Sequence, residues 1–328
     1  MFTSRALRGV VAALLVWLCL GISPGRSAES TLKIPDPQNS SITTDDGLVL
    51  HYTFYPGGFQ QNLKTKEVTA VPGKEVVPIL LLHGWKGKRT EYDATASMLQ
   101  RLGHAIMVPD LRGHGDSNVR RIPGREFTYN LDRMARGDIE MMRADLDAVK
   151  KVLLEKNNAE ELNIELLCVV GAEFGATLAV NWAMADWSWP QLPGFKQGRD
   201  VKVLVLLSPL NSFRGISLDN ALEFPVIRVS LPIMIVVGAE DTKNSRDAKA
   251  IYQRLAKFRG KTPANAKESG GRQNLVLVEP PTSLTGTQLL APRGLTVNQQ
   301  LAGFIHAQLT MRKGDFPWMD RRHRLVSP

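Results

Sequence analysis

Seven short apolar segments, separated by longer amphipathic ones, constrain the fold of this 328-residue chain most strongly. Runs of this length rich in Val, Ile and Leu are typical of buried strands, and they occur at residues 48–55, 77–82, 104–108, 162–170, 201–207, 233–237 and 274–278. Apolar residues at helical spacing occupy residues 91–102, 132–155, 174–185, 245–258 and 297–310. The alternation predicts an α/β fold in which a mostly parallel central sheet carries helices on both faces.

The two ends of the chain differ in composition from this central region. Residues 1–28 place Arg5 and Arg8 before an uncharged apolar run over residues 9–22. This is the pattern of a secretory signal peptide, and the run is shorter than the roughly 20 residues that span a bilayer. We therefore expect a secreted or periplasmic protein. A membrane anchor formed by an uncleaved leader is the alternative, because Arg26 is unusual so close to a cleavage site.

The rest of the chain divides into three parts. Residues 29–46 are polar and contain proline, so we interpret them as a flexible lead-in. Residues 47–310 form the predicted folded domain, within which residues 261–273 are a polar surface insertion. Residues 311–328 are expected to be a loosely structured basic tail.

Composition narrows the classes of function. Hydrophobic residues make up 43% of the chain and charged residues 22%, which is typical of a globular protein. The net charge of +9 includes three leader arginines, and the remaining basic residues are scattered, so we expect no nucleic-acid partner. Without the leader, Cys168 is the sole cysteine, and its apolar neighbours indicate a buried thiol. No phosphate loop, dinucleotide fingerprint or zinc spacing is present, so we expect no cofactor and no metal.

Three motifs directly follow predicted strands, where open α/β sheets place their ligand sites. They are His83-Gly84, the run Asp110-Leu111-Arg112-Gly113-His114-Gly115, and Gly171-x-x-x-Gly175. In this order and spacing they resemble the α/β-hydrolase family over nearly all of residues 47–310. The resemblance implies an α/β-hydrolase fold, and the short stretch of residues 209–225 indicates a short or absent lid.

The resemblance also implies three catalytic positions, and other residue types occupy two of them. The family's strand-to-helix turn reads Gly-x-Ser-x-Gly, and here Glu173 stands in place of the serine. Asp241 matches the acid position, but Thr285 stands where the histidine should be. His306, in the last predicted helix, is the one histidine that we consider able to approach Glu173. A serine mechanism needs a hydroxyl and a base within hydrogen-bond reach, so we predict that these residues do not act as a triad.

The family's oxyanion hole implies roles for two backbone N–H groups, those of Trp85 and Phe174. A carboxylate at Glu173 would lie at a helix N-terminus, where negative charge is favoured. We hypothesise that Glu173 is ionised and lies across these donors, so that it repels an oxyanion. Alternatively, Glu173 is a carboxylate nucleophile, as Asp is in the family's dehalogenases, but Thr285 cannot supply the base that such chemistry needs.

Several other residues admit either a chemical or a structural role. Asp110, His114 and Asp116 could ligate a metal, although a structural turn explains the segment better. His83 is interpreted as a hydrogen-bonded residue of its turn. Ser208 could be a displaced nucleophile, but nothing near it in sequence would activate it. A cluster of aromatic residues could line a pocket, although packing beside the sheet is the better interpretation: Trp182, Trp187 and Trp189.

The sequence therefore predicts an exported, catalytically degenerate α/β-hydrolase-fold protein that acts as a binding or interaction module for a small-molecule or protein ligand. The alternative is an active hydrolase of carboxylic esters or lipids with an unconventional site. Membrane contact is expected only through an uncleaved leader.

Overall fold

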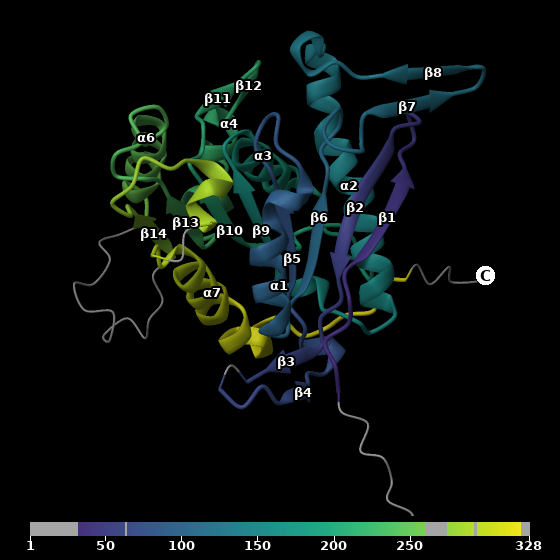
Figure 1. The fold of residues 1–328 in the computed structure, drawn as a ribbon, viewed down its shortest axis with the longest axis vertical. Coiled ribbons are helices and arrows are strands. Elements are labelled where there is room, and N and C mark those ends of the chain that lie inside the picture. The colour runs from purple at the N-terminus through teal and green to yellow at the C-terminus, as the bar shows by residue number, and fades with distance from the viewer. Residues whose placement is uncertain (1–31, 63, 260–273, 292–293, 323–328) are drawn as a thin grey trace, which may run out of the picture. The chain divides into compact units, whose positions relative to one another are not determined.

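An eight-stranded sheet forms the frame of the protein (Figure 1). The computed structural model describes residues 32–62, 64–259, 274–291 and 294–322, so the predicted leader and the predicted insertion lie outside the described residues. The strands follow one another across the sheet in the order β1 (Gln38–Thr43), β2 (Val49–Tyr55), β6 (Ala105–Pro109), β5 (Pro78–Leu82), β9 (Leu167–Ala172), β10 (Val201–Leu207), β13 (Ile233–Val236) and β14 (Leu275–Val278). The six strands from β6 to β14 are parallel, and β1 and β2 are antiparallel to their neighbours.

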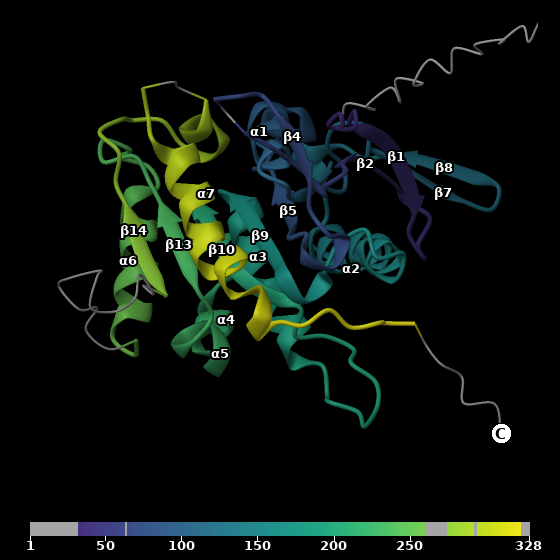
Figure 2. The ribbon, with the colours of Figure 1, turned by 90° about the horizontal axis from the view of Figure 1, so that it is seen from below.

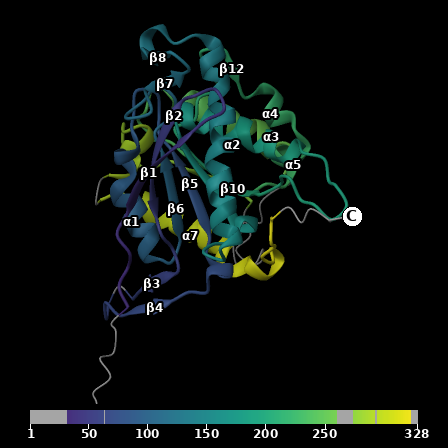
Figure 3. The same cartoon turned by 90° about the vertical axis from the view of Figure 1, so that its right-hand side faces the viewer.

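Helices cover both faces of this sheet (Figures 2 and 3), which confirms the predicted fold class. One face packs against α1 (Asp93–Arg101) and α7 (Val297–Gln308). The other packs against α2 (Arg136–Asn158), α3 (Phe174–Ser188) and α6 (Ser245–Ala256). Successive side chains of a strand point to opposite faces, so Leu80 and Leu82 enter one core and Ile79 and Leu81 enter the other.

Small elements complete the chain, and the sequence pattern did not predict them. Three two-stranded hairpins pair β3 (Phe59–Gln61) with β4 (Val68–Ala70), β7 (Val119–Ile122) with β8 (Arg125–Thr128), and β11 (Ser212–Phe213) with β12 (Ile216–Ser217). The short helices α4 (Asp219–Glu223) and α5 (Pro225–Val229) follow the last hairpin. The segment between β10 and β13 therefore holds a hairpin and two single-turn helices, which agrees with the short lid expected there.

The expected strand at residues 162–170 begins later than predicted. Residues Ile164–Leu166 form a 3-10 turn, in which the Asn163 side chain accepts a hydrogen bond from the Glu165 N–H, and β9 starts at Leu167. The apolar residues of the turn are buried like those of the strand, so hydrophobicity alone did not separate the two. Other 3-10 turns lie at Gly73–Glu75, Arg89–Tyr92, Leu131–Arg133, Gly286–Leu290 and Thr310–Asp315.

The prediction of a flexible lead-in over residues 29–46 is wrong for its second half. Residues 38–43 form β1, which pairs with β2 from Gln38 opposite Phe54 to Thr43 opposite Val49. Asp46 is held by an ion pair with the buried Arg112. Most β1 side chains are exposed, because this edge strand is held by backbone pairing and needs no apolar face. The polar sequence of β1 therefore carries no apolar pattern that would predict a strand.

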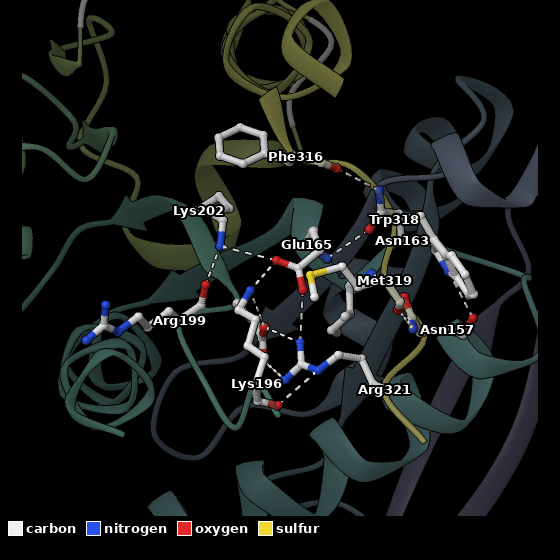
Figure 4. A network of polar contacts seen from close by, with 12 residues as sticks. Asn157, Asn163, Glu165, Lys196, Arg199, Lys202, Phe316, Trp318, Met319 and Arg321 are labelled. Atoms are coloured by element: carbon white, nitrogen blue, oxygen red, sulfur yellow. Dashed lines mark hydrogen bonds and ion pairs between the residues drawn. The ribbon is translucent and has the colours of Figure 1, made fainter. Parts of the chain in front are cut away.

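The prediction of a loosely structured tail is also wrong through residue 322. The side chains of Asn157 and Asn163 donate to the carbonyl oxygens of Met319 and Phe316, at 2.9 and 3.0 Å (Figure 4). Arg321 is buried and forms ion pairs with carboxylates of the main domain. Arg321 neutralises two buried acids, which the sequence could not show.

Within the described parts of the chain, we find no helix with the length and apolarity needed to cross a bilayer.

Candidate functional site

Glu173 occupies a strained turn between β9 and α3. Its φ is +49°, in a region that residues other than glycine rarely adopt. Its N–H donates to the Leu207 carbonyl at 2.8 Å, and its own carbonyl accepts from Ala176 N at 3.1 Å. A Cβ on Gly171 would lie 2.4 Å from the Gly175 oxygen, and one on Gly175 would lie 2.5 Å from the His83 oxygen. The two glycines of the motif therefore permit the close approach that the turn requires.

The Glu173 carboxylate faces a cavity of about 420 Å³ at the carboxyl ends of the parallel strands. Thr285 Oγ1 donates to Glu173 Oε1 at 3.2 Å. A Cβ on Gly84 would lie 2.6 Å from Glu173 Oε2, and one on Gly286 would lie 3.1 Å from Glu173 Cγ. The carboxylate thus lies between two glycines, with one hydroxyl holding it. The cavity, called here the Glu173 cavity, is lined by Gly84, Trp85, Lys86, Gly87, Glu91, Glu173, Thr285, Thr287, Gln288 and Ala291.

The two N–H groups predicted to form an oxyanion hole do not hold this carboxylate. Phe174 is the first residue of α3, where an N–H has no intrahelical acceptor, and Trp85 lines the cavity. Among the hydrogen bonds of the described residues, the Glu173 carboxylate accepts from Thr285 and from neither of these N–H groups. The carboxylate shares the cavity with Trp85, but no hydrogen bond supports the hypothesis that it lies across both donors.

Asp241, at the predicted acid position, accepts hydrogen bonds from N–H groups of its own turn and none from Thr285 in the described structure. Its Oδ1 accepts from the N–H groups of Lys243 and Asn244, both at 3.0 Å. Asn244 Nδ2 donates to Thr285 Oγ1 at 2.5 Å. A chain of hydrogen bonds therefore runs from Asn244 through Thr285 to Glu173, and the Asp241 carboxylate takes part only through its bond with the Asn244 N–H. Sequence analysis missed Asn244, although its position three residues after Asp241 placed it in the same turn.

Two buried acceptors near Thr285 have no donor in the described structure. They are Asp241 Oδ2 and Asn244 Oδ1. Buried polar atoms are nearly always hydrogen-bonded, so each orphan needs an explanation. In the resembled family, the acid position carries the hydrogen bond that orients the histidine. Here the predicted acid position keeps an oxygen without a donor, and a threonine stands at the predicted histidine position.

No described histidine lines the Glu173 cavity. His83 is buried; its Nε2 accepts from Leu111 N at 3.0 Å and its Nδ1 donates to the Gly84 carbonyl at 2.8 Å, which confirms its structural interpretation. Burial lowers the pKa of His83, and burial together with the nearby His83 lowers the pKa of His114 to about 4. His306 lines a separate cavity beside His104, next to the amino end of β6, so α7 does not bring it to Glu173.

The other candidate residues form the scaffold of the site. Asp110 is buried, pairs with Arg89 and accepts from Asp116 N at 3.0 Å, as expected of a structural turn. No three acidic, histidine or cysteine side chains in the described part of the chain are arranged to hold a metal ion. Ser208 is buried, and its Oγ accepts from Gly286 N at 3.0 Å. Its hydroxyl therefore positions the loop beside Glu173.

A second carboxylate and an aromatic cover complete the surroundings of the cavity. Glu91, which sequence analysis did not single out, accepts from Thr287 Oγ1 at 2.8 Å and from Lys88 N at 3.2 Å. The rings of Trp85, Phe174 and Phe213 pack with centroids 5.1 to 5.6 Å apart. The Arg214 guanidinium lies 4.7 Å from the Trp85 ring. The β11–β12 hairpin thus caps Trp85.

A family model described as "Alpha/beta hydrolase family" matches residues 79–323, which is most of the chain. The chain belongs to the alpha/beta hydrolase family. Membership agrees with the sheet order, the strained turn and the three sequence motifs. No curated protein sequence matches the chain significantly.

Solved structures of alpha/beta hydrolases share this fold. A monoglyceride lipase from Saccharomyces cerevisiae has a TM-score of 0.57 at 14% identity, covering 85% of this chain and 97% of its own. A dienelactone hydrolase from Anabaena variabilis has 0.52 at 17%, covering 84% and 100%. An esterase from Rhizomucor miehei has 0.53 at 13%, covering 86% of each chain. At these identities the likeness shows the fold and not the reaction.

Proposed function

We propose that this alpha/beta hydrolase family member has lost serine-hydrolase chemistry and uses the Glu173 cavity to bind a ligand. The observation that carries the proposal is the contact between Glu173 and Thr285 at 3.2 Å. Thr285 donates its proton to the carboxylate and accepts from Asn244, so its hydroxyl is not placed to accept a proton from a nucleophile. The turn is retained, and the two groups that would carry the chemistry are replaced.

The cavity supports binding of a small ligand that donates hydrogen bonds. Its volume of about 420 Å³ falls within the range of about 300–1,000 Å³ that is typical of ligand sites. Two of its lining side chains, Glu91 and Glu173, are carboxylates, and neither forms an ion pair within the described structure. Carboxylates accept hydrogen bonds and repel anions, so the cavity disfavours the oxyanion of ester hydrolysis.

An active hydrolase with a carboxylate nucleophile is the second candidate. The strained turn at Glu173 and the N–H groups of Trp85 and Phe174 favour it, because they are the parts that position a nucleophile and stabilise an oxyanion. Glu173 would attack an ester carbonyl, form an acyl anhydride and expel the alkoxide, which would take a proton from water. Water would then have to hydrolyse the anhydride with help from a base, and Glu91 is the other carboxylate that lines the cavity.

Labelling with a fluorophosphonate tests the first proposal. The reagent phosphonylates an activated serine, so the wild-type protein should remain unlabelled, as should Ser208→Ala. The double variant Glu173→Ser/Thr285→His restores a hydroxyl and an imidazole beside the orphaned Asp241 oxygen, and it should be labelled at position 173. Labelling of any serine in the folded wild-type protein would overturn the proposal.

We also propose that the protein is exported through its N-terminal leader. The support is the sequence pattern alone: Arg5 and Arg8 before an apolar run, followed by small residues. N-terminal sequencing of the protein from fractionated cells should find the mature chain outside the cytoplasm, beginning close to Glu29. An intact N-terminus in a membrane fraction would instead support the uncleaved anchor, and an intact N-terminus in the cytosol would contradict export.

A further inference from the structure

A buried charge network lies near the amino ends of β9 and β10, away from the Glu173 cavity (Figure 4). Its members are linked by ion pairs of 4 Å or less. Three are carboxylates and four are cations: Glu165, Asp186 and Asp200, with Lys150, Lys196, Lys202 and Arg321. Among these seven residues one positive charge is in excess; Asp147 lies near Lys150 and accepts from Trp182, but no described ion pair of this length joins it to them.

Lys202, the second residue of β10, is the cation that this network neutralises least. Its Nζ lies 3.9 Å from the nearest Glu165 oxygen, whereas each of the other three cations has a carboxylate oxygen within 3.1 Å. Its described hydrogen bond goes to the Arg199 carbonyl. Burial, with repulsion from Lys196, lowers the pKa of Lys202 to about 8. A desolvated ammonium without a close counter-ion is an unfavourable arrangement that an added anion would correct.

Lys202 opens onto a cavity of about 320 Å³ with aromatic walls. Its Nζ lies 5.4 Å from the centre of the Trp187 ring and 5.6 Å from that of Phe316. Val226, Leu231 and Pro232 add apolar surface. Trp187 is fixed by a hydrogen bond from Nε1 to the Val201 carbonyl at 2.8 Å. Apolar walls with a few placed polar groups are the usual composition of a ligand site.

The three tryptophans that the sequence grouped together thus have separate surroundings. Trp182 is buried beside the sheet and donates to Asp147 at 2.8 Å, as the packing interpretation expects. Trp187 lines the Lys202 cavity, and Trp189 is 47% exposed. The opposite wall, Phe316, comes from the C-terminal segment, which the Asn163 side chain fixes in place.

We propose that the Lys202 cavity binds a small monoanionic carboxylate with a flat apolar body. The carboxylate would approach Lys202 Nζ and supply the close counter-ion that Lys202 lacks in the described structure. The apolar body would lie against Trp187 and Phe316. This site lies near the amino end of β10, whereas Glu173 follows the carboxyl end of β9, so the proposal is independent of what the Glu173 cavity binds.

Titration calorimetry with 2-naphthoate, paired with 2-naphthalenemethanol, tests the proposal. The two compounds share the ring system and differ in the charge, so we expect saturable binding of naphthoate at least tenfold tighter than binding of the alcohol. Trp187 fluorescence should change on binding. Lys202→Met keeps the length of the side chain and removes the charge, and it should weaken naphthoate binding about 10- to 100-fold. Lys249→Met, which removes an exposed lysine on α6, should leave binding unchanged.

A second variant keeps the test valid if Lys202→Met does not fold. Ser230 is exposed at the rim of the cavity and takes no part in the ion-pair network, so Ser230→Trp should block entry while preserving the melting temperature. Equal affinity for naphthoate and the alcohol, or no saturation up to about 1 mM naphthoate, would overturn the proposal. Unchanged naphthoate binding in Ser230→Trp would overturn it as well.

Discussion

Two groups of carboxylates at opposite ends of the parallel sheet have different surroundings. At the carboxyl ends, Glu173 and Glu91 face a cavity, and hydroxyl groups are their side-chain partners. At the amino ends, Glu165 and Asp200 are buried and surrounded by lysine and arginine. A buried charge that is already paired contributes to a fixed structure, whereas a cavity-facing carboxylate that forms no ion pair remains available to a ligand. The comparison separates carboxylates that a ligand can reach at the Glu173 cavity from carboxylates that the charge network holds.

The sharpest test of this separation is to neutralise one carboxylate at each end. Asp200→Asn leaves Lys150, Lys196 and Arg321 without their shared partner, and we expect it to cost about 3–5 kcal/mol of unfolding free energy. Glu173→Gln keeps an acceptor for Thr285 and should cost less than about 1 kcal/mol. Urea denaturation of both variants measures the difference. Equal losses would remove the distinction between the two ends.

The second prediction concerns the backbone of the turn that holds Glu173. Gly175→Ala places a Cβ 2.5 Å from the carbonyl oxygens of Leu82 and His83, and we expect a loss of about 2–3 kcal/mol in thermal or urea unfolding. Gly137 in α2 is the matched control, because a Cβ there meets nothing within 4 Å. Gly137→Ala should stabilise the protein by about 0.4–1 kcal/mol. A harmless Gly175→Ala would show that the turn is not closely packed.

The third prediction uses pH to probe the charge network around Lys202. Because the pKa of Lys202 is lowered to about 8, the folded protein loses this proton before the unfolded chain does, whose lysine pKa is about 10.4. Between these values the unfolded state binds more protons, so the free energy of unfolding rises with pH. Wild type should gain about 1–2 kcal/mol over this range relative to Lys202→Met. Parallel pH profiles of the two proteins would contradict the lowered pKa.

The smallest expected effect lies in the hydrogen-bond chain beside Glu173. Thr285→Val removes the donor to Glu173 and the acceptor of Asn244, at a cost of about 1 kcal/mol. Thr285→Ser keeps the hydroxyl and should restore most of the stability. If the valine variant were as stable as wild type in urea, the chain of hydrogen bonds would not hold the carboxylate in place.

The sequence could predict the central sheet because burial leaves a strong pattern. The parallel strands read as apolar runs, and the glycines at 171 and 175 marked the strained turn at Glu173 before the structure showed it. The edge strand β1 escaped prediction, because its stability comes from backbone pairing with β2 and not from an apolar face. The pattern of apolar residues indicates only strands that are buried, and most side chains of β1 are exposed.

The sequence could predict where the candidate site lies, but not which side chains contact one another there. The order of the motifs placed Glu173 and Thr285 correctly enough that they meet across 112 residues of chain. Asn244 and Glu91 were missed, because polar residues in loops and at helix starts carry no signal of which partner they reach. The charge network was hidden for the same reason: Arg321 and Glu165 are 156 residues apart, and each reads as an ordinary surface residue.

The measurement that tests the central claim most directly is hydrolysis of short- and medium-chain p-nitrophenyl esters. Wild type, Glu173→Ala and Glu173→Ser/Thr285→His should be assayed side by side, with folding checked by thermal denaturation. We predict no turnover above background for wild type and Glu173→Ala, and turnover by the double variant, because the strained turn and its N–H donors persist. Ester hydrolysis by wild type that Glu173→Ala abolishes would contradict the account and establish a carboxylate-based enzyme.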